Sequence, residues 1–99
     1  MANYTIRIEL HGASAQDYLR LHDAMFQIGA KIYIEGDNGV AYQMPSAEYD
    51  LENTGLSAAQ VRDVAYEIAR RFTPNPWVLV TEVASRAWVL RPLNAANVA

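Results

Sequence analysis

The stretch NYTIRIELH, residues 3–11, decides the fold because apolar and polar residues alternate along its whole length. One side of this alternation carries Tyr4, Ile6, Ile8 and Leu10, and the other side carries Thr5, Arg7, Glu9 and His11. A period of two residues is typical of a β-strand that buries one face. We therefore predict a half-buried strand that ends at Gly12.

A helix is predicted directly after this strand. Ser14 is followed three residues later by Asp17, which is the spacing of a capping box at a helix N-terminus. An apolar stripe at helical spacing then runs through Tyr18, Leu21, Met25 and Ile28. Gly29 stands where a helix C-terminus favours a left-handed residue, so we expect the helix to end there.

A second helix has a similar start signal. Ser57 is followed by Gln60 at the same capping-box spacing, and apolar positions continue at helical intervals as far as Phe72. The segment TPNP, residues 73–76, cannot extend a helix because each proline disfavours helical geometry in the residue before it. We expect the second helix to stop before this segment.

Two short strands are predicted between the helices. Residues 31–35 and 40–44 are rich in β-branched and aromatic side chains, and the turn GDNG at 36–39 joins them as a hairpin. Residues 46–55 are predicted to be a polar loop. A last strand is expected at 77–83, and residues 85–90 form either a short fifth strand or an extension of it.

The predicted order of strand, helix, strand, strand, helix, strand indicates an α+β domain of the ferredoxin-like class. In that arrangement, four antiparallel strands form one sheet, and both helices cover the same face. We expect a single domain over residues 1–92 and a flexible tail at 93–99. The second face of the sheet stays open, and homodimerisation often covers such a face.

Composition limits the chemistry. The 99 residues hold eight Lys and Arg against eleven Asp and Glu, and the only lysine is Lys31, so a broad basic surface for nucleic acid is excluded. Cysteine is absent, which excludes thiol nucleophiles, disulfides and cysteine-based zinc sites and fits a cytoplasmic protein. No apolar run is long enough to span a membrane. No pattern for a metal or another cofactor is present.

Four residues are candidates for chemistry on a phosphate. Arg7 and His11 share the polar side of the first strand, and Arg20 and His22 lie on the first helix. Histidine can transfer protons near neutral pH, and arginine can stabilise the charge of a phosphorane. The simpler interpretation is that Arg7 and His11 lie on a solvated sheet face or at a dimer seam. Arg20 and His22 would then lie on a solvated helix face.

Other polar and aromatic groups favour structural roles. The run Glu48, Asp50 and Glu52 lacks the spacing of a calcium loop and is interpreted as a solvated acidic loop. Trp77 and Trp88 are better explained by core packing or a dimer interface than by base stacking.

Three stretches of the sequence resemble a known family. They are YLRLHDAM at 18–25, LSAAQV at 56–61, and MPSAEY at 44–49 together with VLVTE at 78–82. The pattern is similar to that of the endoribonuclease antitoxin GhoS of type V toxin–antitoxin systems, and closer to the uncharacterised bacterial and phage branch of that group. The resemblance implies a ferredoxin-like fold and metal-independent cleavage of a cognate toxin transcript. Arg20 matches a family arginine, whereas His22 stands where the pattern has another arginine.

Two functional hypotheses follow. The first is a small antitoxin-like protein that binds or cleaves RNA, with His11, His22 and Arg20 as catalytic residues and Arg7 as an RNA contact. The second is a non-catalytic homodimeric module that binds protein, as in phage or accessory genomes, and its motivation is the apolar strand at 77–83. Both hypotheses include a homodimer and no membrane.

Overall fold

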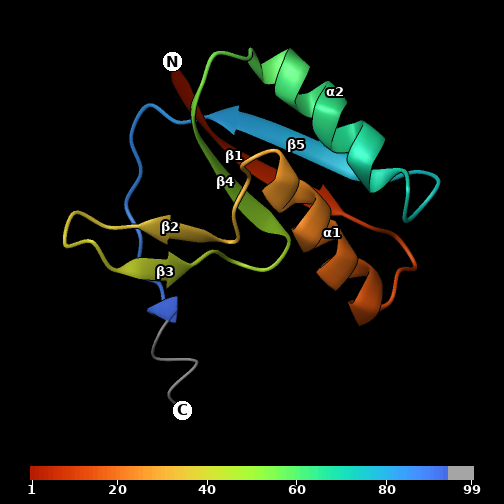
Figure 1. Ribbon diagram of the computed structural model, residues 1–99, viewed down its shortest axis with the longest axis horizontal. Coiled ribbons are helices and arrows are strands. Elements are labelled where there is room, and N and C mark those ends of the chain that lie inside the picture. The colour runs from red at the N-terminus through yellow and green to blue at the C-terminus, as the bar shows by residue number, and fades with distance from the viewer. Residues whose placement is uncertain (94–99) are drawn as a thin grey trace.

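The computed structural model describes residues 1–93 and contains two helices and five strands (Figure 1). The first strand, β1 at Ala2–Glu9, confirms the alternation in the sequence. Tyr4, Ile6 and Ile8 are at most 2% exposed and form the centre of the core. The core therefore lies against the one face of β1 that the sequence predicted.

Both helices begin as predicted. Helix α1 spans Ala15–Gln27, and Ser14 forms a complete capping box with Asp17. Helix α2 spans Ala58–Ala69 and is capped in the same way by Ser57 with Gln60. Gly29 follows the end of α1 with φ of 87°, a left-handed conformation that residues with a side chain rarely adopt.

The predicted hairpin is also present. Strand β2 at Tyr33–Glu35 pairs antiparallel with β3 at Ala41–Gln43. Gly39 occupies the turn with φ of 77°, which explains why a glycine is required there. The hairpin forms a two-stranded sheet of its own.

The predicted polar loop at 46–55 is wrong, because most of it is a strand. Strand β4 spans Glu48–Thr54 and pairs antiparallel with β1. Tyr49 and Leu51 enter the core, whereas the acidic residues that alternate with them, Glu48, Asp50 and Glu52, lie on the opposite face. The carboxylates are therefore part of a sheet and not of a solvated loop.

The main sheet has three strands in the order β4-β1-β5, with β5 at Trp77–Glu82. Both helices lie on one face of it, as predicted (Figure 1). The single four-stranded sheet that the sequence predicted is replaced by this sheet and the separate hairpin. One isolated bridge, between Lys31 and Asp50, connects the chain just before β2 to the outer side of β4. The molecule is thus an α+β fold with antiparallel sheets.

Residues 83–93, here called the C-terminal strap, contain no regular strand, so the short strand expected at 85–90 is not formed. The strap instead runs from β5 to the hairpin, where the amide of Gln43 donates to the carbonyl of Arg91 at 2.9 Å. Residues 94–99 of the predicted tail lie outside the described residues. Neither described helix is long and apolar enough to cross a membrane.

Candidate functional site

Arg7 lies on the open face of the sheet, opposite to the helices. In the register of the strands it stands between Glu48 of β4 and Leu79 of β5. Its Nη1 is 3.5 Å from Oε2 of Glu48, and half of its side chain remains in contact with solvent. Arg7 is therefore available to a ligand, although a carboxylate already offsets its charge.

His11 lies beyond the end of β1 and contacts the loop before β5. Its Nδ1 is 3.1 Å from the carbonyl oxygen of Asn75, and its Nε2 is 3.2 Å from a carboxylate oxygen of Glu9. The ring of Trp77 meets the imidazole edge to face, with centroids 4.5 Å apart. The hydroxyl of Thr73 also donates to the His11 carbonyl. His11 thus fixes the loop between α2 and β5.

Arg20 is an exposed residue on the outer surface of α1. Its Nη1 is 3.9 Å from Oδ1 of Asp17, one turn earlier on the same helix. An exposed pair of this kind contributes little to stability or orientation. Arg20 does not line the groove that contains Arg7 and His22.

His22 is held by a buried tyrosine of β4. Its Nδ1 is 2.7 Å from Oη of Tyr49, which has no exposed surface. Burial raises the pKa of the Tyr49 phenol, with a smaller contribution from Tyr18, so the hydroxyl keeps its proton. Burial lowers the pKa of the His22 imidazole, against a smaller opposite effect of Asp23. His22 is therefore mainly neutral at pH 7, and its Nδ1 shares a hydrogen bond with the Tyr49 hydroxyl.

A groove of about 680 Å³ brings two of the four predicted residues together. It runs between α1 and the segment that leads from β3 into β4, and both Arg7 and His22 line it. Its apolar wall consists of Ala15, Leu19, Ile32, Met44, Pro45 and Ala47. His11 and Arg20 do not line it, so the proposed catalytic set is not assembled in one chain.

The charges of the groove do not suit a polyanion. Its one guanidinium, Arg7, is accompanied by the carboxylates of Glu9 and Glu48. Affinity for a nucleic-acid backbone depends on an excess of cations, which this arrangement lacks. The groove instead offers the neutral His22 imidazole as a hydrogen-bonding group beside an apolar wall, an arrangement suited to a small, weakly charged ligand.

A second polar cluster lies on the open face of the sheet and was missed by sequence reasoning. Asp50 is only 4% exposed, and its Oδ1 accepts from Nη2 of Arg86 at 2.6 Å. Nη1 of Arg86 donates to the hydroxyl of Thr5 at 3.0 Å, and Nη2 lies 3.6 Å from Oε2 of Glu52. Arg86 comes from the C-terminal strap, so this cluster fastens the strap to the sheet.

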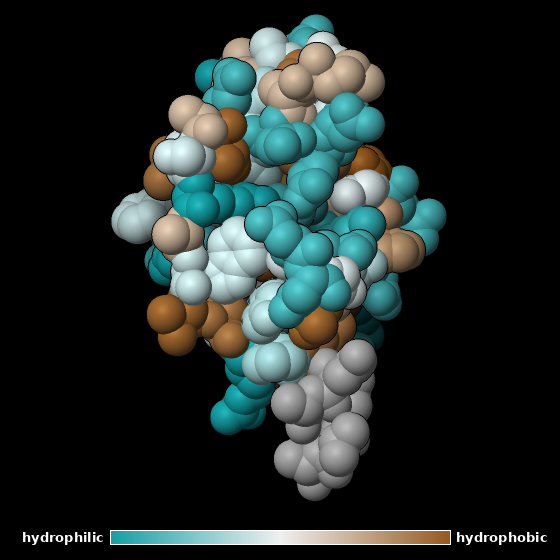
Figure 2. Space-filling model, turned by 90° about the vertical axis from the view of Figure 1, so that its left-hand side faces the viewer, coloured by the Kyte–Doolittle hydropathy of each residue, from teal (hydrophilic) through white to brown (hydrophobic). Residues whose placement is uncertain are grey.

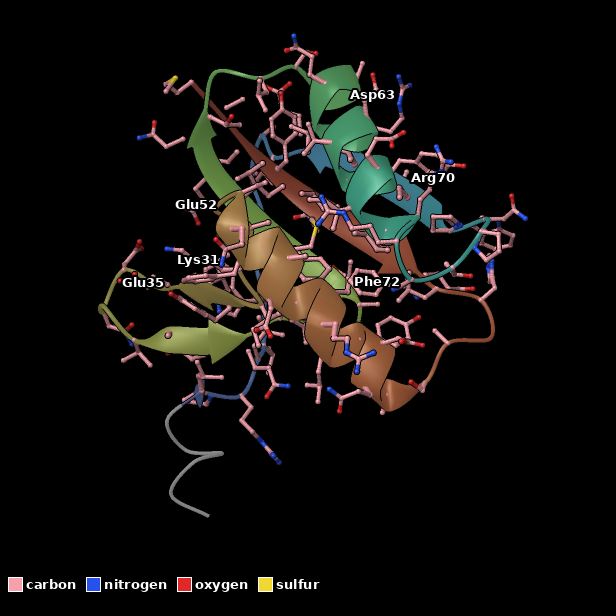
Figure 3. All side chains as sticks on the ribbon, turned by 45° about the vertical axis from the view of Figure 1, so that its right-hand side comes forward. Lys31, Glu35, Glu52, Asp63, Arg70 and Phe72 are labelled. Carbon is pink, nitrogen blue, oxygen red and sulfur yellow. The ribbon has the colours of Figure 1, made fainter. Side chains whose placement is uncertain are left out.

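Beside this cluster is a small cavity of about 90 Å³ between the hairpin and β4. Lys31, Glu35 and Glu52 gather around it (Figure 3). Hydrogen bonding with Asp50, together with burial, raises the pKa of the Glu52 carboxyl to about 7. Residues 1–93 contain no group of three His, Asp or Glu side chains arranged to hold a metal ion.

The largest apolar side chains on the surface of the sheet belong to β5. Trp77 is 67% exposed and Leu79 is 64% exposed, and both lie on the open face. Trp88 of the strap is less exposed and lies against Tyr42 of β3, with ring centroids 6.2 Å apart. The two tryptophans therefore belong to different surfaces, and neither is part of the groove.

The alternating pattern of residues 48–52 could have placed Asp50 on a strand. Nothing in the sequence near Arg86 indicates its role, because its partners lie 36 and 81 residues earlier in the chain.

Comparison of the chain with protein-family models finds no match. Comparison with curated proteins finds no match either.

Proposed function

We propose that this protein is a non-catalytic, homodimeric protein-interaction module. The observation that carries the proposal is the exposed outer strand β5, with Trp77 and Leu79 side by side on its open face. Natural edge strands are blunted by lysine, proline or bulges, because unpaired backbone groups recruit other strands. Residues 77–82, WVLVTE, contain no lysine and no proline. An apolar edge of this kind favours association.

The distribution of the predicted catalytic residues supports the same proposal. His11 is engaged with the loop before β5, and Arg20 lies on the outside of α1. Neither reaches the groove that contains Arg7 and His22, so the two histidines and Arg20 do not face one substrate within a single chain.

The hairpin end of the molecule is a poor alternative surface. Figure 2 shows that hydrophilic side chains spread across the middle of this end, and hydrophobic groups occur in separate patches. Because a stable interface requires a continuous, well-packed area, we place the association at β5.

The proposal is tested by light scattering coupled to gel filtration over a range of protein concentrations. We expect a dimer for the natural protein and a shift to monomer for Leu79→Glu. Leu19→Glu is the matched control, because Leu19 is a similarly exposed leucine on α1. A natural protein that remains monomeric at high concentration would overturn the proposal.

A second candidate function is RNA binding or cleavage by a GhoS-like antitoxin, supported by the position of Arg7 and His22 in one groove. Its test is incubation of the protein with mixed RNA in the presence of a chelator. Binding or cleavage that is lost in Arg7→Ala and His22→Ala, but kept in Arg20→Ala, would support it. Intact, unbound RNA would exclude it.

We also propose that the fold is a variant of the ferredoxin-like class. The bridge between Lys31 and Asp50 supports this, because extending it would add β2 next to β4. The strand order would then be β5-β1-β4-β2, with β3 as an additional hairpin arm. An experimental structure with continuous pairing of residues 31–35 and β4 would establish the assignment, and a hairpin detached from β4 would exclude it.

A further inference from the structure

One edge of β5 is free among the described residues. The strand pairs with β1 along one side, and no other described strand pairs with it. The amide of Val83 donates to the carbonyl of Asn3 at 2.8 Å, so odd-numbered residues of this segment direct their backbone groups to β1. The amides and carbonyls of Val78, Val80 and Glu82 therefore point to the free edge.

We propose that two copies of the chain pair antiparallel along this free edge, with Leu79 of each copy facing Leu79 of the other across a twofold axis. The two three-stranded sheets then form one continuous six-stranded sheet. This inference rests on the proposed homodimer and specifies its interface. Twofold symmetry suits a single strand, because an antiparallel pair of identical strands is self-complementary.

The twofold axis at Leu79 places apolar groups opposite one another. On the open face, the two Leu79 side chains meet as a non-hydrogen-bonded pair, the type in which side chains approach most closely. Trp77 then stands opposite Thr81 of the second copy. On the face covered by the helices, Val78 stands opposite Val80 of the second copy, and these residues supply the hydrogen bonds of the ladder.

The charges of β5 favour the same register. Glu82 is its only charged residue and lies at its last position, so the two Glu82 carboxylates end up at opposite ends of the paired strands. Moving the axis by one residue, to Val80, would place Glu82 opposite Val78 on the helix-covered face. Desolvating a carboxylate there is unfavourable, so the register centred on Leu79 is preferred.

The natural absence of cysteine makes this register directly measurable. Non-hydrogen-bonded antiparallel pairs have Cα atoms about 4.5 Å apart, within the range that a disulfide bridges. We expect Leu79→Cys to form a disulfide-linked dimer under mild oxidation. Thr81→Cys alone stays uncrosslinked, whereas a mixture of Trp77→Cys and Thr81→Cys gives the mixed dimer.

Each result has a defined meaning. A mixed disulfide between Leu79→Cys and Thr81→Cys, with none between two Leu79→Cys chains, would move the axis to Val80 and overturn the inference. A dimer by light scattering that forms none of these disulfides would also overturn the inference, while the proposed homodimer would stand. A natural protein that is strictly monomeric would overturn both the inferred interface and the proposed homodimer. Leu19→Cys, on α1, serves as the control for random collision.

Discussion

Nη2 of Arg86 lies 2.6 Å from Oδ1 of Asp50, which joins the C-terminal strap to a carboxylate that is almost completely buried in the sheet. The same guanidinium donates to the hydroxyl of Thr5 on β1. One side chain of the strap therefore contacts two strands of the main sheet. Because the strap continues to the hairpin through Arg91, this contact also helps to position the hairpin.

Replacing Arg86 by alanine should destabilise the protein strongly. Removal of the guanidinium leaves the Asp50 carboxylate buried without a cation, a change that costs about 3 kcal/mol in comparable buried pairs. We expect a decrease of that size in the free energy of unfolding, measured by urea titration. Arg91→Ala is the matched control, because Arg91 belongs to the same strap and its side chain is exposed.

The control should change the free energy of unfolding by no more than about 0.5 kcal/mol, as is usual for exposed positions. Equal effects of Arg86→Ala and Arg91→Ala would mean that the strap contributes through its backbone alone. In that case the buried ion pair would have no stabilising role of its own.

The carboxyl of Glu52 should make stability depend on pH. Its pKa is raised to about 7, chiefly by hydrogen bonding with Asp50 and by burial, whereas Arg86 and Lys31 act in the opposite direction. A group whose pKa is higher in the folded state stabilises that state while it is protonated. This contribution is complete below the ordinary pKa of glutamate and is lost as the pH rises through about 7.

We therefore expect Glu52→Gln to weaken the decrease in melting temperature between pH 5 and pH 8, as measured by circular dichroism. Glu35→Gln is the control, because Glu35 lines the same small cavity but is not among the groups that shift the pKa of Glu52. An unchanged pH dependence in Glu52→Gln would contradict a proton shared between Asp50 and Glu52.

Much of the fold could be predicted because its signals are local. The alternation of β1 lies within nine residues, and each helix start is specified by a serine and a partner three residues later. Strand β4 was missed although Glu48-Tyr49-Asp50-Leu51-Glu52 alternates as regularly as β1 does. Three carboxylates so close together favour the interpretation as a solvated loop, yet the ion pair with Arg86 allows one of them, Asp50, to be buried.

The candidate site was less predictable because its geometry depends on tertiary structure. Sequence position put His22 on α1 but did not indicate that Tyr49 of β4 would hold its ring. Arg7 and His22 lie on different elements, and only the segment between β3 and β4 closes a groove around them. His11 was expected beside Arg7, but β1 ends at Glu9 and His11 contacts the loop before β5 instead.

The serine caps should stabilise the two helices independently. Ser14→Ala and Ser57→Ala each remove a side-chain acceptor for an otherwise unpaired amide, of Asp17 and of Gln60 respectively. Each loss typically costs about 1 kcal/mol. Urea unfolding of the double variant should give the sum of the two effects, since the caps share no partner. A much larger combined loss would contradict independent capping.

The contact between Tyr49 and His22 should fix the tautomer of the imidazole. We expect the phenol hydroxyl, 2.7 Å from Nδ1, to donate to it, so nitrogen-15 NMR should find the proton of the natural protein on Nε2. Burial lowers the pKa of His22 below its ordinary value of 6.5. The unfolded chain therefore takes up a proton at this position more readily than the folded protein, and the folded state loses stability as the pH falls below about 6.5. Tyr49→Phe removes the donor; we expect a weaker tautomer preference and a loss of stability of about 1 kcal/mol. Tyr33→Phe, on β2, is the matched control, and an unchanged tautomer in Tyr49→Phe would show that another group orients His22.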